Sequence, residues 1–152
     1  MMNTEALKTL VPDLRNAPPR SPHEKLGSFV IAARVVDKAR ADLLGINGEY
    51  NYHPCGLAAF LWKLTEIKPE DFREFVATGA DDEACGKWLL EHSKVQDEKE
   101  IIRWNNKMRC QLICDLPDQY QEYYETYIPE CCPHPHRIRF FFDVYDDEEG
   151  RL

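Results

Sequence analysis

The sequence predicts an all-α protein that folds as one compact domain. Through most of the chain, apolar residues recur at every third or fourth position, which is the spacing of an amphipathic helix. Glycine, proline and serine divide the chain into segments of the length that helices have in globular proteins. One segment, residues 137–145, alternates as a strand does, but no second strand is evident to pair with it. We therefore expect about six short helices around one long helix.

Residues 1–19 are predicted to form an extended N-terminal arm. The arm ends in two prolines, and proline disfavours helical backbone in the residue before it. The helical domain is then expected to cover residues 20–152. Its first structured element follows at once, because Ser21 and Glu24 have the spacing of a capping box, in which two side chains bind backbone N–H groups at a helix start.

Five helices are expected in the centre of the chain. In each of them the apolar residues fall on one stripe at about 100° per residue. The longest carries Ile101, Trp104 and Met108 in register. The expected helices cover about residues 29–44, 54–64, 69–78, 81–92 and 94–114.

A tyrosine-rich helix is expected after Pro117. Its inner face carries Tyr120, Tyr123, Tyr124 and Tyr127, which recur at helical spacing. Buried tyrosine packs its ring and keeps its hydroxyl at the rim, so we interpret this face as a packing surface. If the same face were exposed in a monomer, it would mark a homodimer interface.

The chain is acidic overall, with a net charge of −8 and an isoelectric point of about 5.1. This balance argues against nucleic-acid binding, because proteins that bind phosphate backbones usually present a basic face. No long apolar run and no signal peptide are evident, so we expect no membrane segment and a cytoplasmic location.

The two ends of the chain carry opposite charge. The first 40 residues have seven basic and four acidic side chains, whereas residues 111–152 have three basic and ten acidic ones. We therefore predict that Asp143 and the acidic C-terminal tail Asp146–Glu149 lie against the arginines of the N-terminal part. These arginines are Arg15, Arg20, Arg34 and Arg40.

Arg40 falls within the apolar arc when residues 29–44 are projected as a helix. An unpaired buried guanidinium would cost several kcal/mol, so Arg40 is expected to meet a carboxylate. Asp37, Glu49 or an acid of the tail could supply it. The pair would either fix the packing of the helix or leave Arg40 as an anion-binding group at a pocket. Lys38 projects the opposite way and is expected to be solvated.

Asn105 lies beside the apolar stripe of the longest predicted helix. A buried amide needs partners for its oxygen and its nitrogen, so Asn105 either bridges to a loop backbone or lines a pocket. The loop of residues 49–53 would suit such a bridge. Within that loop, Glu49 and Tyr50 could perform acid–base chemistry or simply satisfy backbone groups.

A set of short motifs follows one another along the chain, namely Arg20–Gly27, Asp37–Ala41, Gly48–Tyr50 with Tyr52, Trp104–Asn105, Phe142–Asp143 and Glu148–Arg151. This ordered set resembles a known bacterial family, the one catalogued as domain of unknown function 5069. The resemblance implies a small, mostly helical, cytosolic domain with no established activity. The sequence departs from the pattern after Tyr52, where it reads Pro54–Cys55–Gly56–Leu57 in place of a Cys-Pro-Leu-Asp-like run.

Cysteine and histidine gather in the C-terminal third of the chain, where they could bind zinc. Thiolate and imidazole are the ligands that Zn²⁺ prefers, and two cysteines one helical turn apart can bind one ion. The spacing is not that of a zinc ribbon or finger, so thiols packed on a second helix face remain an alternative interpretation. The candidate ligands are Cys110, Cys114, Cys131, Cys132, His134 and His136.

Cys55 is a candidate nucleophile. It lies at the start of a predicted helix, with His53 two residues before it, and both features favour the thiolate. An inert, partly buried thiol is the alternative.

The leading hypothesis is a non-catalytic binding or interaction module. Polar residues predicted on apolar faces would form a polar core, which could line a pocket for a small anionic ligand. These residues are Arg40, Asp37, Glu49, Tyr50 and Asn105. A zinc protein and a cysteine-dependent enzyme are the two alternatives.

Overall fold

The computed structural model describes all 152 residues and confirms the all-α prediction. Eight α-helices and two short 3₁₀ turns follow one another without a β-strand. None of the helices is long and apolar enough to cross a membrane. The helices are α1 (Thr4–Leu10), α2 (Ala32–Leu43), α3 (Ala58–Thr65), α4 (Pro69–Ala77), α5 (Asp82–His92), α6 (Glu98–Arg109), α7 (Asp118–Cys131) and α8 (Phe141–Glu148).

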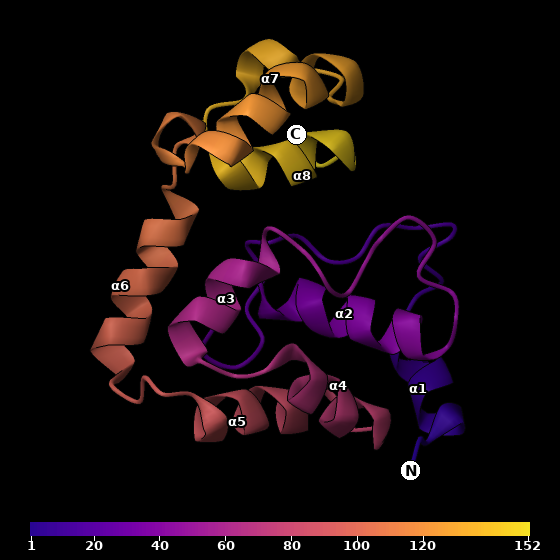
Figure 1. Ribbon diagram of the computed structural model, residues 1–152. Coiled ribbons are helices and arrows are strands. Elements are labelled where there is room, and N and C mark those ends of the chain that lie inside the picture. The colour runs from indigo at the N-terminus through magenta and orange to yellow at the C-terminus, as the bar shows by residue number, and fades with distance from the viewer.

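Helix α2 lies at the centre of the fold. Every residue from Ala32 to Ala41 is buried, which is the pattern of a helix covered on all sides. Helices α3, α4 and α5 contact α2 directly. Figure 1 shows α4 and α5 below α2, and α7 and α8 stacked above it. Both the charged and the apolar residues of α2 must therefore find partners inside the protein.

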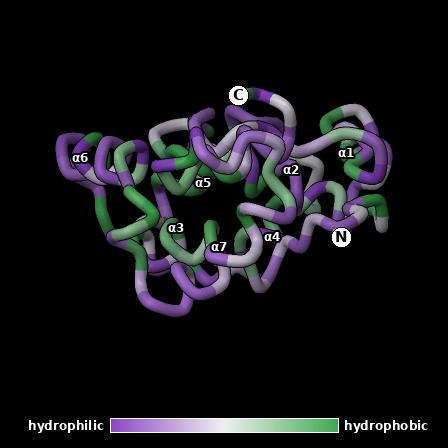
Figure 2. Tube along the Cα trace, turned by 90° about the horizontal axis from the view of Figure 1, so that it is seen from above, coloured by the Kyte–Doolittle hydropathy of each residue, from purple (hydrophilic) through white to green (hydrophobic).

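Helix α6 connects the lower layer to the upper one. It lies at the edge of the molecule opposite α1 (Figures 1 and 2). The apolar side of α6 carries the buried residues Ile101 and Met108. Helix α6 also contacts α8. Its other side is polar, as expected for an amphipathic surface helix.

Two glycines allow the loop before α2 to cross α5 closely. Gly27 has φ of +59°, a conformation that favours glycine. A Cβ atom added to Gly86 would lie 2.9 Å from the Gly27 backbone nitrogen, closer than real Cβ contacts. The turn that precedes α2 is therefore fixed directly against α5.

The predicted extended arm is wrong for residues 4–10, which form α1. The Asn3 side chain accepts a hydrogen bond from the Ala6 backbone N–H and so caps the helix. Leu7 and Leu14 are buried in the interior. The two prolines end the segment as expected, but these leucines dock the arm on the domain.

The capping-box spacing at Ser21 does not start a helix. Residues 21–24 form a turn, and the Ser21 hydroxyl donates to Asp146 Oδ2 at 3.1 Å. The Ser21 side chain, which the local pattern predicted to cap a helix, therefore binds Asp146, a residue distant in the sequence.

The predicted long helix of residues 94–114 is also wrong in extent. Helix α6 has 12 residues, and the longest helix is α7, with 14. The chain leaves the helical path after Arg109 because the backbone of residues 111–113 pairs with that of residues 139–141. The strand-like segment 137–145 becomes helical at Phe141. The acidic tail is not a free extension, because Asp146–Glu148 are the end of α8 and Glu149 is its C-cap.

Candidate functional site

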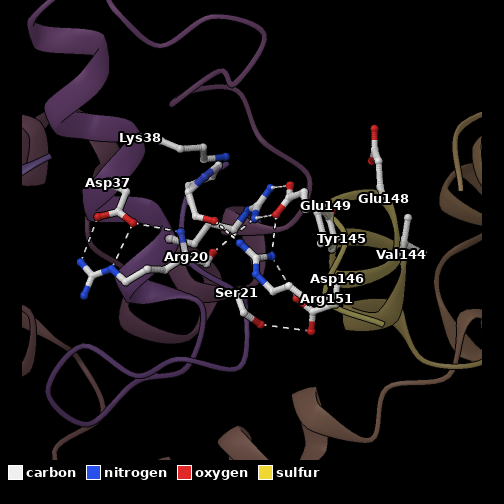
Figure 3. Close-up of polar contacts among 12 residues, drawn as sticks. Arg20, Ser21, Asp37, Lys38, Val144, Tyr145, Asp146, Glu148, Glu149 and Arg151 are labelled. Carbon is white, nitrogen blue, oxygen red and sulfur yellow. Dashed lines mark hydrogen bonds and ion pairs between the residues drawn. The ribbon is translucent and has the colours of Figure 1, made fainter. Parts of the chain in front are cut away.

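The prediction that the C-terminal acids lie against the N-terminal arginines is confirmed for Glu149 only. Asp146 accepts from Ser21, whereas Asp147 binds His134, Glu148 binds Tyr127 and Asp143 accepts from the Phe140 N–H. The Arg34 guanidinium binds Glu149 with two hydrogen bonds, of 2.8 and 2.6 Å, and both side chains are only 4% exposed. Although burial lowers the pKa of Arg34, the hydrogen bonds that it donates to Glu149 raise it overall. Figure 3 shows neighbouring contacts in this region, among them Ser21 with Asp146 on α8 and Arg20 with Asp37 on α2. Arg151 adds a hydrogen bond to the Pro19 carbonyl.

Arg40 is buried and paired, but its acid is none of the expected ones. Its guanidinium donates to Asp82 Oδ1 at 2.8 Å and to the Ala80 carbonyl at 3.0 Å. Asp37 binds Arg20 instead, through Nη2 at 2.9 Å and Nε at 3.0 Å. Arg20 also reaches Asp82, so the four charges form one chain between α2 and α5. Each arginine of this cluster is already neutralised by a carboxylate.

Asn105 bridges to a loop backbone, although to a different loop from the expected one. Its Oδ1 accepts from the Val30 N–H at 3.1 Å, and its Nδ2 donates to the Ser28 carbonyl at 2.8 Å. These bonds hold the segment before α2 against α6. Glu49 is exposed, and the Tyr50 ring lies under the Arg34 guanidinium at 5.6 Å. Of the five predicted residues, Asp37 and Arg40 therefore belong to one ion-pair cluster, whereas Tyr50 and Asn105 make separate contacts and Glu49 is exposed.

The candidate zinc ligands are not brought together. No three His, Cys, Asp or Glu side chains are grouped so that they could hold a metal ion. Cys114 precedes α7 and Cys131 ends it, and a helix of 14 residues is about 20 Å long. His134 Nδ1 lies 2.8 Å from Asp147 Oδ1, and Cys132 Sγ contacts the Val144 carbonyl. Cys110, Cys114 and Cys131 are exposed thiols, and His136 lies in a 3₁₀ turn.

The tyrosine-rich face of α7 forms a cavity together with α8. The cavity has a volume of about 440 Å³, and five of its nine lining residues are tyrosines. Glu148 is the only charged residue among them. The Tyr127 hydroxyl donates to the Glu148 carboxylate at 2.6 Å and so fixes its position. The lining residues are Gly56, Gln119, Tyr120, Tyr123, Tyr124, Tyr127, Val144, Tyr145 and Glu148.

The rings around this cavity have a defined arrangement. Tyr123 and Tyr127 stack nearly parallel at 5.0 Å, and Tyr124 stands at steep angles to both. The Tyr124 and Tyr145 hydroxyls are 3.1 Å apart, and burial raises the pKa of Tyr124 to about 12, so both phenols stay neutral at physiological pH. Arg34 lies over the Tyr145 ring at 4.9 Å. The tyrosines that line the cavity are therefore in contact with the buried Arg34–Glu149 ion pair.

Near the cavity, Cys55 contacts Lys38 rather than the expected His53. The Lys38 ammonium donates to Cys55 Sγ at 3.0 Å, and Lys38 is only 5% exposed. Burial lowers the pKa of Lys38. Burial alone would raise the pKa of Cys55, but the charge and the hydrogen bond of Lys38 lower it overall. The pair therefore favours a thiolate, the reactive form of cysteine.

Lys38 was expected to be solvated, and that expectation is wrong. The projection of one isolated helix assigns its polar face to water, whereas α2 is covered on all sides. The signal that could have identified Lys38 is the small-residue content of α2, because four of its 12 residues are alanine and neighbours can approach closely.

A search of curated proteins finds no match to the chain. The model of one family, described as Domain of unknown function (DUF5069), matches residues 16–151. This range contains α2, the tyrosine-lined cavity and both ends of the Arg34–Glu149 pair, so the match covers the whole described site. The chain belongs to the DUF5069 family.

Proposed function

We propose that this domain binds a small organic cation in the tyrosine-lined cavity. The observation that carries the proposal is the lining itself, in which five tyrosines and one carboxylate surround the space and no basic side chain takes part. A volume of about 440 Å³ lies within the range of small-molecule sites, from roughly 300 to 1,000 Å³.

Aromatic rings and a carboxylate select for positive charge. The faces of tyrosine rings are electron-rich and attract ammonium groups, most strongly where water is excluded. Tyr123, Tyr124 and Tyr127 present rings in two nearly perpendicular orientations, an arrangement that can surround a compact cation. Glu148 supplies a full negative charge, and the Tyr127 hydroxyl keeps it in place. A primary amine or a quaternary ammonium group fits this chemistry.

The proposal changes the charge expected of the ligand but keeps the expected class of function, a binding module. The sequence favoured an anion because buried arginines were predicted. Arg34 and Arg40 now have carboxylate partners at 2.6 to 2.8 Å, so neither has a free charge to offer an anion. An anion in the cavity would also approach Glu148.

We further propose a cytoplasmic location. All six cysteines are free thiols, which is the usual state in a reducing compartment. A secreted chain of this size with six cysteines would more often contain disulfides.

The test is calorimetric titration with choline and with 3,3-dimethylbutan-1-ol, its neutral analogue of nearly the same shape. Choline is expected to bind about tenfold more tightly, because cation–π contacts with partly exposed rings are worth about 0.5 to 1 kcal/mol each and Glu148 adds the attraction of a full charge. Glu148→Gln and Tyr123→Leu should each weaken choline binding by a similar factor. Tyr123 is 56% exposed, so its replacement should not impair folding.

The matched control is Glu122→Gln, which removes an exposed carboxylate from α7 outside the cavity lining. It should leave choline binding unchanged. Equal binding of the neutral analogue, or loss of choline binding in the control, would contradict the proposal. Tighter binding of acetate than of choline would restore the anion site predicted from the sequence.

A further inference from the structure

The buried Lys38 and the partly exposed Cys55 form a pair of two nucleophiles. Cys55 Sγ is the only side-chain hydrogen-bond partner of the Lys38 ammonium, at 3.0 Å. The sulfur also accepts a weak hydrogen bond from the Ala58 backbone N–H at 3.5 Å, at the start of α3. No disulfide occupies Cys55. A sulfur held against an amine in this way has one neighbour with which it can form a new covalent bond.

We propose that Lys38 and Cys55 form an oxidative cross-link, in which peroxide oxidises the sulfur and the lysine nitrogen then bonds to it. The proposal assigns a modification site to the chain, independently of the ligand proposed for the cavity. The oxidant is hydrogen peroxide or another small peroxide.

The chemistry proceeds in two balanced steps. In the first, the Cys55 thiolate attacks one oxygen of hydrogen peroxide, the O–O bond breaks, and a sulfenic acid and water result. In the second, the lone pair of neutral Lys38 attacks the sulfur, the S–O bond breaks, and water leaves with a proton from the amine. The product has an S–N bond, and one peroxide molecule has accepted the two electrons lost by the pair. With a second peroxide molecule, the Lys38 nitrogen attacks one peroxide oxygen, the O–O bond breaks, and a hydroxylamine and water result. The hydroxylamine oxygen then attacks the sulfenic sulfur, the S–OH bond breaks, and a further water leaves, so that one oxygen remains between sulfur and nitrogen.

The surroundings favour this reaction over its competitors. A sulfenic acid normally condenses with a nearby thiol or backbone nitrogen, and in this protein an amine is already in contact with the sulfur. Burial also lowers the pKa of Lys38, which increases the share of the neutral, nucleophilic amine. Cys55 is partly exposed, and the adjacent Gly56 lines the 440 Å³ cavity, so a molecule as small as peroxide has a route to the sulfur.

The experiment uses the full chain with the exposed Cys110, Cys114 and Cys131 replaced by serine, so that only three thiols remain to be oxidised. Peroxide treatment and intact-mass spectrometry should show a loss of about 2 Da for a direct S–N bond or a gain of about 14 Da with one retained oxygen. Tryptic digestion should yield residues 35–40 linked to residues 41–63, with no cleavage after Lys38. Dithiothreitol should reverse the link.

Lys38→Arg is the matched control, because it keeps the positive charge but its guanidinium stays protonated and does not attack the sulfur. In this variant Cys55 should gain two or three oxygens and no linked peptide should form. Lys38→Met serves the same purpose if arginine does not fit. Cys85 is an internal control, because its buried thiol contacts the Ala80 carbonyl and burial raises its pKa to about 11. Oxidation of Cys55 in the parent protein without a link to Lys38 would overturn the proposal, as would equal oxidation of Cys85.

Discussion

Lysine is rarely buried in a folded protein unless its charge is matched, and Lys38 is matched by a thiol. The contact between Lys38 and Cys55, together with their burial, changes the pKa of both groups. Burial lowers the pKa of the amine, and the charge of the amine lowers the pKa of Cys55 below its ordinary value of 9.0. Between these lowered values and the ordinary ones, the unfolded chain binds more protons than the folded one. Folding stability should therefore rise with pH in this range.

Replacement of Lys38 by methionine should reverse this dependence. The variant loses the lysine titration, and burial then raises the pKa of Cys55, so the cysteine contributes stability that falls with rising pH. The stability difference between parent and variant should change by about 1 kcal/mol or more from about pH 7 to about pH 9. Urea unfolding under reducing conditions measures it.

Groups shared by both proteins cancel in this comparison. Cys85, whose pKa is also raised by burial, contributes the same slope to each. Parallel stability curves for parent and Lys38→Met would mean that the pair does not perturb either group.

For single residues, the sequence can predict that a buried charge needs a partner, but not which residue the partner is. The need of Arg40 for a carboxylate follows from its position on an apolar face, and the structure confirms it. The identity of the partner does not follow, because Asp82 is 42 residues away and only the packing of α5 against α2 brings it near. The burial of Lys38 was not predicted, because a helix projection identifies the apolar face of a helix but not which other elements cover its polar face.

At the scale of elements, the crossing of the loop before α2 over α5 depends on Gly86. An alanine in the middle of a helix usually stabilises it by about 1 kcal/mol relative to glycine. At Gly86 the added Cβ would lie 2.9 and 3.0 Å from backbone atoms of Gly27, which cannot rotate away. We expect Gly86→Ala to destabilise the protein by about 1 to 3 kcal/mol in urea unfolding, the typical cost of overpacking.

Gly45→Ala separates the steric effect from backbone strain. Gly45 has φ of +70° but no atom within 4 Å of an added Cβ, so this variant should lose only about 1 kcal/mol. A Gly86→Ala protein as stable as the parent, or more so, would mean that the loop can move off α5.

The helices that the sequence predicted well have their boundary signals in their own residues. Helix α4 starts at Pro69, and Asp81 caps α5 by accepting from the Ala84 N–H at 2.9 Å. The poorly predicted ones depend on distant contacts. The Phe141 N–H donates to the Gln111 carbonyl at 2.7 Å, which ends the path of α6 and starts α8. No local pattern contains that contact.

At the scale of the whole molecule, the two ends of the chain close the fold. Arg34 and Glu149 are 115 residues apart in sequence, and Ser21 and Asp146 are 125 apart. Deletion of residues 149–152 would leave the Arg34 guanidinium buried without its carboxylate, a defect that typically costs 3 to 5 kcal/mol. For a chain of this size, we expect the melting temperature to fall by about 10 °C or more, measured by circular dichroism.

Deletion of Leu152 alone is the control, because this residue is exposed and should be dispensable. The longer deletion should also unfold in one transition if α8 and α2 belong to the same cooperative unit. An unchanged melting temperature after removal of Glu149 would show that the C-terminal acids serve solubility and not stability.

The closure of the two ends bears on how the protein is made in the cell. Helix α2 leaves the ribosome well before α8 and Glu149, which follows α8. In the interval, the nascent chain carries a helix whose buried surface is only partly covered, a state that is prone to aggregate. The synthesis of α8 and Glu149 therefore ends the period in which α2 is exposed to non-native contacts.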